Sequence, residues 1–283
     1  MSRPRRAVLV APVSSERMAR RALSTVVDEV VLDLEDAVTP AGKDEARAAL
    51  AGLVSAGIAD PHRSATINIR VNARTTRWHD DDMSTVGSLR GLSGVVVPKV
   101  ESADDVLAVA ARLDDPDIGV TALVETARGI ENVGAICAAS PRLDAVVIGY
   151  ADLGAEIGRS PTAPPEVWLR VQDSVLLAAR AAGVAVIDGP YLGVTDDGDF
   201  RRSTAWVRDL GFDGKWVIHP AQIATVTAAF TPDDDAVSRA ERVLAALADS
   251  EGVGAGAVAM DGMMLDEAVA VAARRVLTRA GRS

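Results

Sequence analysis

Cysteine, histidine and aromatic residues are scarce in this 283-residue chain. It contains one cysteine, Cys137, and three histidines, and phenylalanine, tryptophan and tyrosine together make up 3% of the residues. A single cysteine excludes an internal disulfide and a cysteine-rich metal site. Because histidine ligands are also few, any bound metal is expected to be a hard cation held by carboxylate oxygens, either Mg2+ or Mn2+.

Long apolar runs and a positive net charge are missing as well. No apolar run approaches the roughly 18 residues that a membrane-spanning helix requires. The apolar run after the basic stretch MSRPRR is too short for the core of a secretory signal, so we expect a cytoplasmic protein. The net charge of -10 argues against nucleic acid and anionic membranes as partners. It still permits a locally positive pocket for an anionic ligand.

Aliphatic residues are abundant instead, and they occur in short runs. Hydrophobic residues make up 48% of the chain. The runs lie at residues 7–10, 29–33, 65–71, 94–97, 122–124, 145–148, 184–187 and 215–218. Short apolar runs separated by helix-length segments are typical of parallel strands that are buried on both faces. About eight strand-then-helix units predict a (β/α)8 barrel.

The last part of the chain follows the eighth unit and therefore cannot belong to the barrel wall. We expect a barrel over residues 1–230 and a helical arm over residues 231–283, with helices at 233–249 and 265–277 joined by a glycine-rich connection. The methionine-rich turn between Met260 and Leu265 would be poorly placed in water. It can be buried on a neighbouring subunit, or the arm can fold back onto its own barrel.

Two acidic residues follow neighbouring predicted strands. Glu125 closes the run 122–124, and Asp152 comes shortly after the run 145–148. Because parallel strands end at the same edge of a barrel, where ligands bind, we expect the two carboxylates to lie close together. Each acid alone is better explained as a helix cap or a solvated side chain. As a pair they favour a site for Mg2+ or Mn2+.

Further charged residues follow other predicted strands. The run 29–33 leads into Glu35 and Asp36, and crowded acids at a strand end need a cation or hydrogen-bond donors. Arg70 ends the third run and either complements a substrate carboxylate or is an exposed surface arginine. Lys99 follows the fourth run, where a lysine offers a different chemistry, a Schiff base with a carbonyl substrate.

A basic helix start follows the first predicted strand. Ser14 or Ser15 can cap a helix that carries Arg17 in its first turn. Arginines at such a position hold phosphate with the help of free backbone N–H groups. The alternative is a solvated basic face.

Seven motifs occur in order from about residue 7 to about residue 277. They are VVLDLEDAV, INIRVN, VVVPKVES, ALVETARGIEN, GYADLG, FDGKWVIHPAQI and GAVAMDGMMLDEA. Together they resemble the citrate lyase β-subunit-like family of the HpcH/HpaI aldolase superfamily, which includes malyl-CoA and citramalyl-CoA lyases. One departure is HPAQ, where the family usually has HPSQ or HPGQ.

The resemblance implies a TIM barrel with a C-terminal helical extension that reaches a neighbouring subunit, usually in a homotrimer, with a hexamer as the alternative. It implies that Glu125 and Asp152 bind Mg2+, or Mn2+ in its place, and that Glu35 and Asp36 hold metal-bound waters.

The resemblance also implies how the substrate is bound. Arg70 is similar to the residue that binds the carboxylate and carbonyl oxygen of a keto acid. The region around Arg17 is similar to one that contacts the phosphates of coenzyme A. Asp266 matches an acid on the C-terminal segment, and it would exchange a proton with the enolate carbon in the active site of a neighbouring subunit.

The implied function is that of a Mg2+-dependent carbon–carbon lyase. Such an enzyme cleaves or forms a 3-hydroxyacyl-CoA thioester such as malyl-CoA, methylmalyl-CoA or citramalyl-CoA, and its other participants are acetyl- or propionyl-CoA and glyoxylate or pyruvate. Two alternatives remain open at this level. One is an aldolase that acts on free keto acids, with a metal or through Lys99, and the other is a partner-dependent subunit like that of citrate lyase.

Overall fold

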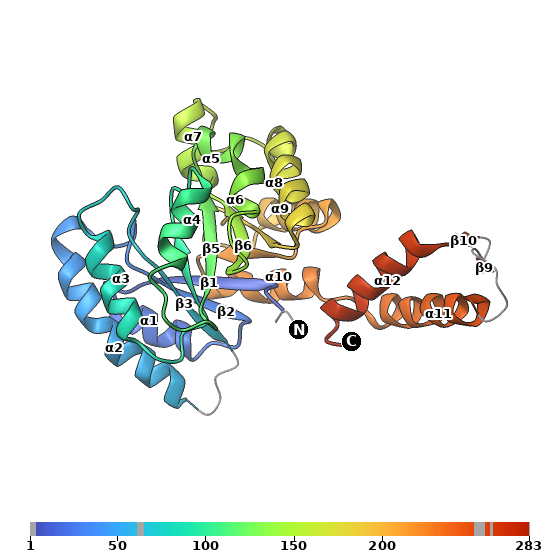
Figure 1. The fold of residues 1–283 in the computed structure, drawn as a ribbon, viewed down its shortest axis with the longest axis horizontal. Helices are drawn as coiled ribbons and strands as arrows, with labels where there is room; N and C mark the ends of the chain where they lie inside the picture. Colours follow the sequence, from blue (N-terminus) through green and yellow to red (C-terminus); the bar gives the residue numbers. More distant parts are fainter. Residues whose placement is uncertain (1–3, 61–64, 252–257, 261–262, 283) are drawn as a thin grey trace. The chain divides into compact units, whose positions relative to one another are not determined.

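Eight parallel strands close into a barrel in the computed structural model, with β1 paired to both β2 and β8 (Figure 1). The structure describes residues 4–60, 65–251, 258–260 and 263–282. The barrel strands are β1 (Ala7–Pro12), β2 (Glu29–Asp33), β3 (Thr66–Arg70), β4 (Gly94–Val97), β5 (Gly119–Val124), β6 (Leu143–Ile148), β7 (Ala185–Asp188) and β8 (Gly214–Val217). The predicted (β/α)8 barrel is confirmed.

Helices connect the strands and cover the outside of the barrel (Figure 1). They are α1 (Glu16–Leu23), α2 (Lys43–Ala59), α3 (His79–Ser88), α4 (Ala103–Ala110), α5 (Ala127–Glu131), α6 (Val133–Cys137), α7 (Tyr150–Ile157), α8 (Leu169–Ala182) and α9 (Gly198–Leu210), with short 3-10 turns η1 (Pro40–Gly42) and η2 (Pro165–Trp168). The last strand is followed by η3 (Pro220–Gln222) and α10 (Ile223–Phe230). Glycines in the left-handed conformation end α7, α8 and α9 at Gly158, Gly183 and Gly211.

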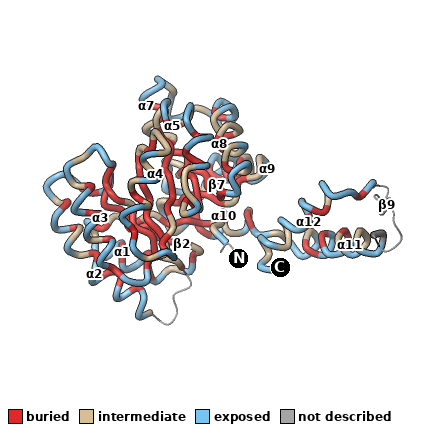
Figure 2. Tube along the Cα trace, in the orientation of Figure 1, coloured by how far each residue is buried: buried red, intermediate tan, exposed pale blue. Residues whose placement is uncertain are grey.

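Successive side chains along each strand point alternately into the barrel and toward the surrounding helices. One buried cluster contains Val8, Val31, Val96, Leu123, Ala145, Val147, Ile187 and Trp216. The cluster takes one residue from each of six strands and two from β6, Ala145 and Val147, which are two positions apart as one face of a strand requires. Figure 2 shows that the strands are buried along most of their length. The aliphatic interior leaves polar side chains at the strand ends, which is where a barrel binds ligands.

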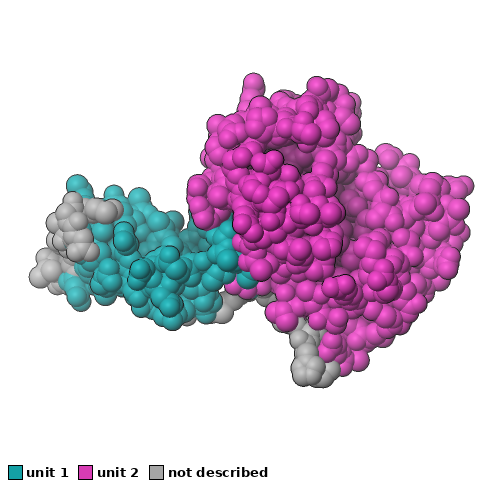
Figure 3. All heavy atoms as spheres, turned by 180° about the vertical axis from the view of Figure 1, so that it is seen from behind, with its two compact units in different colours: residues 1–4, 227–283 teal, residues 5–226 magenta. Residues whose placement is uncertain are grey.

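The residues pack as two compact units, one of residues 5–226 and the other containing residues 227–282 (Figure 3). The second unit contains α11 (Asp234–Glu251), β9 (Val258–Met260), β10 (Met263–Leu265) and α12 (Glu267–Arg279). Ala240, Val243, Leu265 and Ala273 form its buried cluster. The division into a barrel and an arm at residue 230, and the reach of the arm to a neighbouring subunit, stay predictions.

The arm contains a feature that the sequence analysis missed. Strands β9 and β10 pair antiparallel, so residues 258–260 are not irregular, and the last helix begins at Glu267 rather than at Leu265. The intervening Asp261 and Gly262 lie outside the described residues. An Asp-Gly pair between two short apolar runs is a hairpin signal, and it was available in the sequence. Met264 is 70% exposed while Leu265 is 1% exposed, the alternation of a half-buried strand.

Within the described ranges of the chain, no helix is both long enough and apolar enough to cross a membrane. The cytoplasmic location expected from the sequence stays a prediction.

Candidate active site

Arg70 is held at the carboxyl end of the barrel by two acids. It is the last residue of β3 and lies in register with Asp33, the last residue of β2. Its Nε and Nη2 donate to the two oxygens of Asp33, each at 2.6 Å, and Nη1 lies 2.9 Å from Oε2 of Glu35. Burial lowers the pKa of Arg70, but the carboxylates outweigh it and the pKa is raised. Arg70 is therefore a fixed and permanently charged guanidinium.

Lys99 lies where three carboxylates converge. Its Nζ is 2.9 Å from Oε1 of Glu35, 3.5 Å from Oδ1 of Asp152 and 3.7 Å from Oε1 of Glu125. Among the residues that the structure describes, Lys99 is the only non-glycine with a positive φ, at 53°. A side chain in this conformation is strained and usually marks a functional position. Asp33 was not among the predicted site residues, and Lys99 was considered only as a lysine that could form a Schiff base.

The surroundings of Lys99 weigh against a Schiff base. Burial lowers the pKa of Lys99, but its hydrogen bond to Glu35 and the charge of Glu125 outweigh that effect and raise the pKa. A Schiff base requires a neutral amine, and the catalytic lysines that form one have a lowered pKa. The Lys99 ammonium is instead a counter-ion to the carboxylates.

Glu125 is a buried carboxylate that faces the same position. It is 2% exposed, and burial together with the charge of Glu35 raises its pKa to about 8. Its Oε1 accepts a hydrogen bond from the backbone N–H of Lys99 at 2.9 Å. Gly149 makes room for it, because a Cβ at this position would lie 2.4 Å from Oε2 of Glu125. A carboxylate that is buried in this way stays ionised only when a cation is close.

Asp152 reaches the site from a helix rather than directly from a strand end. It lies in the first turn of α7, and its side chain is 40% exposed. Asp36 is exposed beside the buried Glu35, and its charge contributes to the raised pKa of Glu35, for which burial is the main cause. The fold thus brings Glu35, Glu125 and Asp152 around Lys99, and Arg70 joins the site through Glu35.

The donor set fits a hydrated Mg2+ ion. Among the described residues, no three His, Cys, Asp or Glu side chains converge as ligands of one metal. Mg2+ usually keeps several waters, however, and takes only one or two carboxylates. Glu125 and Asp152 supply the carboxylates. Oε2 of Glu35 is buried without a hydrogen bond, although it forms an ion pair with Arg70, and it offers an acceptor for a metal-bound water.

Two other predicted residues lie in different surroundings. Arg17 is exposed in the first turn of α1, where the side chain of Ser15 caps the helix by accepting from the N–H of Met18 at 3.4 Å. Asp266 is the N-cap of α12, and its side chain accepts from the N–H of Val269 at 3.1 Å. The roles proposed for both residues stay predictions.

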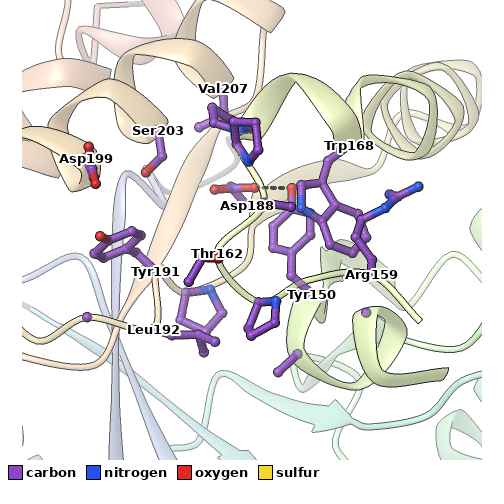
Figure 4. A pocket seen from close by; sticks show the side chains of 18 of the residues that line it. Tyr150, Arg159, Thr162, Trp168, Asp188, Tyr191, Leu192, Asp199, Ser203 and Val207 are labelled. Carbon is purple, nitrogen blue, oxygen red and sulfur yellow. Dashed lines mark hydrogen bonds between the residues drawn. The ribbon is translucent and has the colours of Figure 1, made fainter. Parts of the chain in front are cut away.

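A buried polar network beside the site was also missed. Lys215 on β8 pairs with Asp188 at the end of β7, and Tyr150 at the start of α7 donates to Asp188 at 2.6 Å. These side chains line a cavity of about 480 Å³, and Figure 4 shows Tyr150, Asp188 and Trp168 around it. A charged residue within a strand-like run, such as Lys215 in KWVI, was the available signal, because a buried charge requires a partner.

The family follows from comparison with known proteins. A model of the HpcH/HpaI aldolase/citrate lyase family matches residues 6–220. The chain belongs to this family.

Relatives of named activity match almost the whole chain. The chain is 36% identical to a (3S)-malyl-CoA thioesterase of Cereibacter sphaeroides, over 98% of this chain and 95% of the relative. It is 32% identical to an L-malyl-CoA/beta-methylmalyl-CoA lyase of Rhodobacter capsulatus, over 94% and 91%. Among solved structures, the protein CitE of Mycobacterium tuberculosis in complex with magnesium, acetoacetate and coenzyme A has a TM-score of 0.78 and 33% identity, and the match covers 99% of both chains.

Replacing Lys99 by methionine tests the charge balance of this HpcH/HpaI family site. In EDTA, Lys99→Met should lower the free energy of unfolding by about 1–2 kcal/mol, since the carboxylates lose a cation that is partly screened by solvent. Mg2+ should raise the stability of the variant more than that of the wild type, because it relieves a larger repulsion. Chemical denaturation with and without Mg2+ measures both effects. Equal stability of the two proteins in EDTA would contradict this account.

Arg70→Lys should reduce turnover by about 10²–10³-fold although the charge is kept, because an ammonium cannot reproduce the fork of donors that a guanidinium provides. Steady-state kinetics on the purified variant measure the loss. Arg180→Lys is the matched control. Arg180 lies away from the site and donates a similar pair of hydrogen bonds to Asp213, at 2.7 and 2.8 Å. A near wild-type rate in Arg70→Lys would show that Arg70 does not touch the substrate.

Proposed function

We propose that this protein is a Mg2+-dependent carbon–carbon lyase that acts on a 3-hydroxyacyl-CoA thioester. Malyl-CoA, methylmalyl-CoA and citramalyl-CoA are the substrates of this class, and the products are acetyl- or propionyl-CoA and glyoxylate or pyruvate. The observation that carries the proposal is the convergence of Glu125, Asp152 and Arg70 at the carboxyl end of the barrel. The relatives named as a malyl-CoA lyase and as a CitE complex with magnesium and coenzyme A support it.

Glu125 and Asp152 would hold the metal, with Glu35 placed to accept from a bound water. When bound, Mg2+ supplies a Lewis acid that polarises the carbonyl oxygen released by C–C cleavage. The raised pKa of Glu125 supports this role, because a carboxylate that burial destabilises gains most from a nearby cation.

Arg70 would bind the oxygen atoms of the keto acid. A guanidinium has five N–H groups, and Asp33 accepts two of them through Nε and Nη2. We assign remaining donors of Arg70 to the carboxylate and carbonyl oxygen of the substrate. The fork onto Asp33 fixes the plane of the guanidinium before the substrate binds, so little reorganisation is needed when negative charge develops on the oxygen.

The remaining steps need a proton carrier and a thioester site. In cleavage, the substrate hydroxyl loses its proton to a base as it becomes the carbonyl, and the electron pair of the broken C–C bond becomes the enolate of the acyl-CoA, whose carbon must be protonated. We assign this proton to Asp266 of a neighbouring subunit in a homotrimer or hexamer. Arg17, exposed at the start of α1, would contact the phosphates of coenzyme A.

Thioester hydrolysis is the second candidate, because the chain is 36% identical to a (3S)-malyl-CoA thioesterase. The two reactions share a substrate and differ in the bond that breaks. A lyase yields a keto acid and a shorter acyl-CoA, whereas a thioesterase yields a hydroxy acid and free coenzyme A. An aldolase acting on free keto acids and a partner-dependent subunit are the remaining alternatives.

A substrate panel with and without metal separates these candidates. We expect malyl-CoA or citramalyl-CoA to be cleaved in Mg2+, with the keto acid and acyl-CoA detected by mass spectrometry. EDTA should abolish turnover, and Mg2+ or Mn2+ should restore it, because the polarising cation is lost and regained. Malate with free coenzyme A would identify a thioesterase. Full activity in EDTA would overturn the metal-dependent mechanism.

Subunit mixing tests the shared site. Asp266→Asn is the suitable variant because asparagine caps a helix as well as aspartate does, so that α12 keeps its start while the acid is removed. Asp266→Asn and Glu125→Ala should each be nearly inactive alone. Co-expressed, they should form mixed oligomers that recover a fraction of wild-type activity, because some sites combine an intact barrel with an intact arm. Mixed oligomers that stay inactive would exclude the shared site.

A further inference from the structure

A chain of polar side chains runs through the layer between the barrel wall and its helices. Asp188 directly follows the inward-facing Ile187 on β7, and Lys215 directly precedes the inward-facing Trp216 on β8. Because neighbouring side chains of a strand point to opposite faces, both charged side chains point outward from the barrel. Lys215 Nζ pairs with Asp188 and also donates to the carbonyl oxygen of Gly189 at 3.1 Å. Both charged side chains are buried, at 2% and 1% exposure, which is costly unless every donor and acceptor is satisfied.

The chain continues from the strands to three helices through Tyr150. Its phenol donates to Oδ1 of Asp188 at 2.6 Å and accepts from Nε2 of Gln172 on α8 at 2.9 Å. Oε1 of Gln172 in turn accepts from Nε1 of Trp206 on α9 at 2.9 Å. The ring of Tyr150 also packs edge-on against Trp168, with centroids 4.9 Å apart. Tyr150 is therefore held both by the hydrogen bonds of its hydroxyl group and by the packing of its ring.

The position of Tyr150 in α7 connects this network to the candidate metal site. Tyr150 is the first residue of α7, and Asp152 lies two residues later in the same turn. At about 100° per residue, the two side chains leave the helix on nearly opposite sides. The Tyr150 side chain reaches the polar network behind β7. The Asp152 carboxylate, on the other side of the helix, lies 3.5 Å from Nζ of Lys99.

No side chain caps the start of this helix; only the backbone N–H of Gly149 is tied down, to the carbonyl oxygen of Val124 at 3.0 Å. The N-cap residue of α7 is Gly149, which provides no side-chain hydrogen bond. A larger residue is excluded there, because a Cβ would collide with Glu125. The glycine that admits Glu125 thus leaves the first turn of α7 without the hydrogen bond that usually fixes a helix start.

We infer that Tyr150 is a positioning residue for Asp152, holding the first turn of α7 through Asp188 and Gln172 so that the Asp152 carboxylate faces Glu125. The inference rests on the proposed function, since it assumes that Asp152 binds the metal. The cavity beside Tyr150 leaves the ring room to move once its hydroxyl bonds are lost (Figure 4). Asp152 would then sample positions away from Glu125, and a metal bound by both would be held less tightly.

The test is the affinity of Tyr150→Phe for Mn2+, measured by titration calorimetry and by the electron paramagnetic resonance signal of free Mn2+. We expect affinity about 10-fold weaker than that of the wild type, as for the loss of other groups that orient metal ligands. Saturating Mn2+ should restore most of the turnover. Tyr191→Phe is the matched control, since Tyr191 is the other tyrosine of the chain and lines the same cavity. It should bind Mn2+ as the wild type does.

The outcomes separate the inference from the proposed function. If the wild type does not bind Mn2+, or if Asp152→Ala binds it as tightly, the proposed metal site is wrong. If the wild type binds Mn2+, Asp152→Ala does not, and Tyr150→Phe retains full affinity, only the positioning role is overturned. Should Tyr150→Phe fail to fold, Gln172→Met removes the donor on the other side of the phenol. A smaller loss of affinity is expected there, and unchanged affinity would equally overturn the role.

Discussion

The balance of charge at the carboxyl end of the barrel is the constraint on which the site depends. The carboxylates are Asp33, Glu35, Glu125 and Asp152, and the cations that face them are Arg70 and Lys99. Burial raises the pKa of both Glu35 and Glu125, so these two carboxylates depend on nearby cations to stay ionised. Because the four carboxylates outnumber the two cations, the site keeps an excess of negative charge that attracts a divalent ion.

Barrel geometry places these charges without a large cost to the core. Most inward-facing positions lower in the barrel are aliphatic, and the charged side chains of the site lie at the carboxyl ends of β2 and β3 and just after β5. A carboxylate at such an end can face ligands while its neighbours in the strand stay buried. Gly149 shows how closely the site is fitted, because any side chain there would occupy the space of Glu125.

The two proposed metal ligands are supported in different ways. Glu125 follows a strand, and the backbone N–H of Lys99 orients it directly. Asp152 lies on a short helix whose start has no side-chain cap, and the hydrogen bonds of Tyr150 come from β7 and α8. Through Tyr150, the buried Lys215–Asp188 pair is connected to the helix that carries Asp152.

The sequence by itself determined the eight strands, the barrel and the strand-end positions of Glu125, Glu35 and Arg70, because strand length and side-chain alternation are local properties. The sequence also indicated the family, through motifs that are spread over nearly the whole chain. Only the tertiary structure decided that Lys99 is a counter-ion rather than a free amine and that Arg70 forks onto Asp33. It alone revealed that Tyr150 joins Asp188 and Gln172. These partners are far apart in the sequence and meet through the register of closed strands and the packing of helices, which no local pattern records.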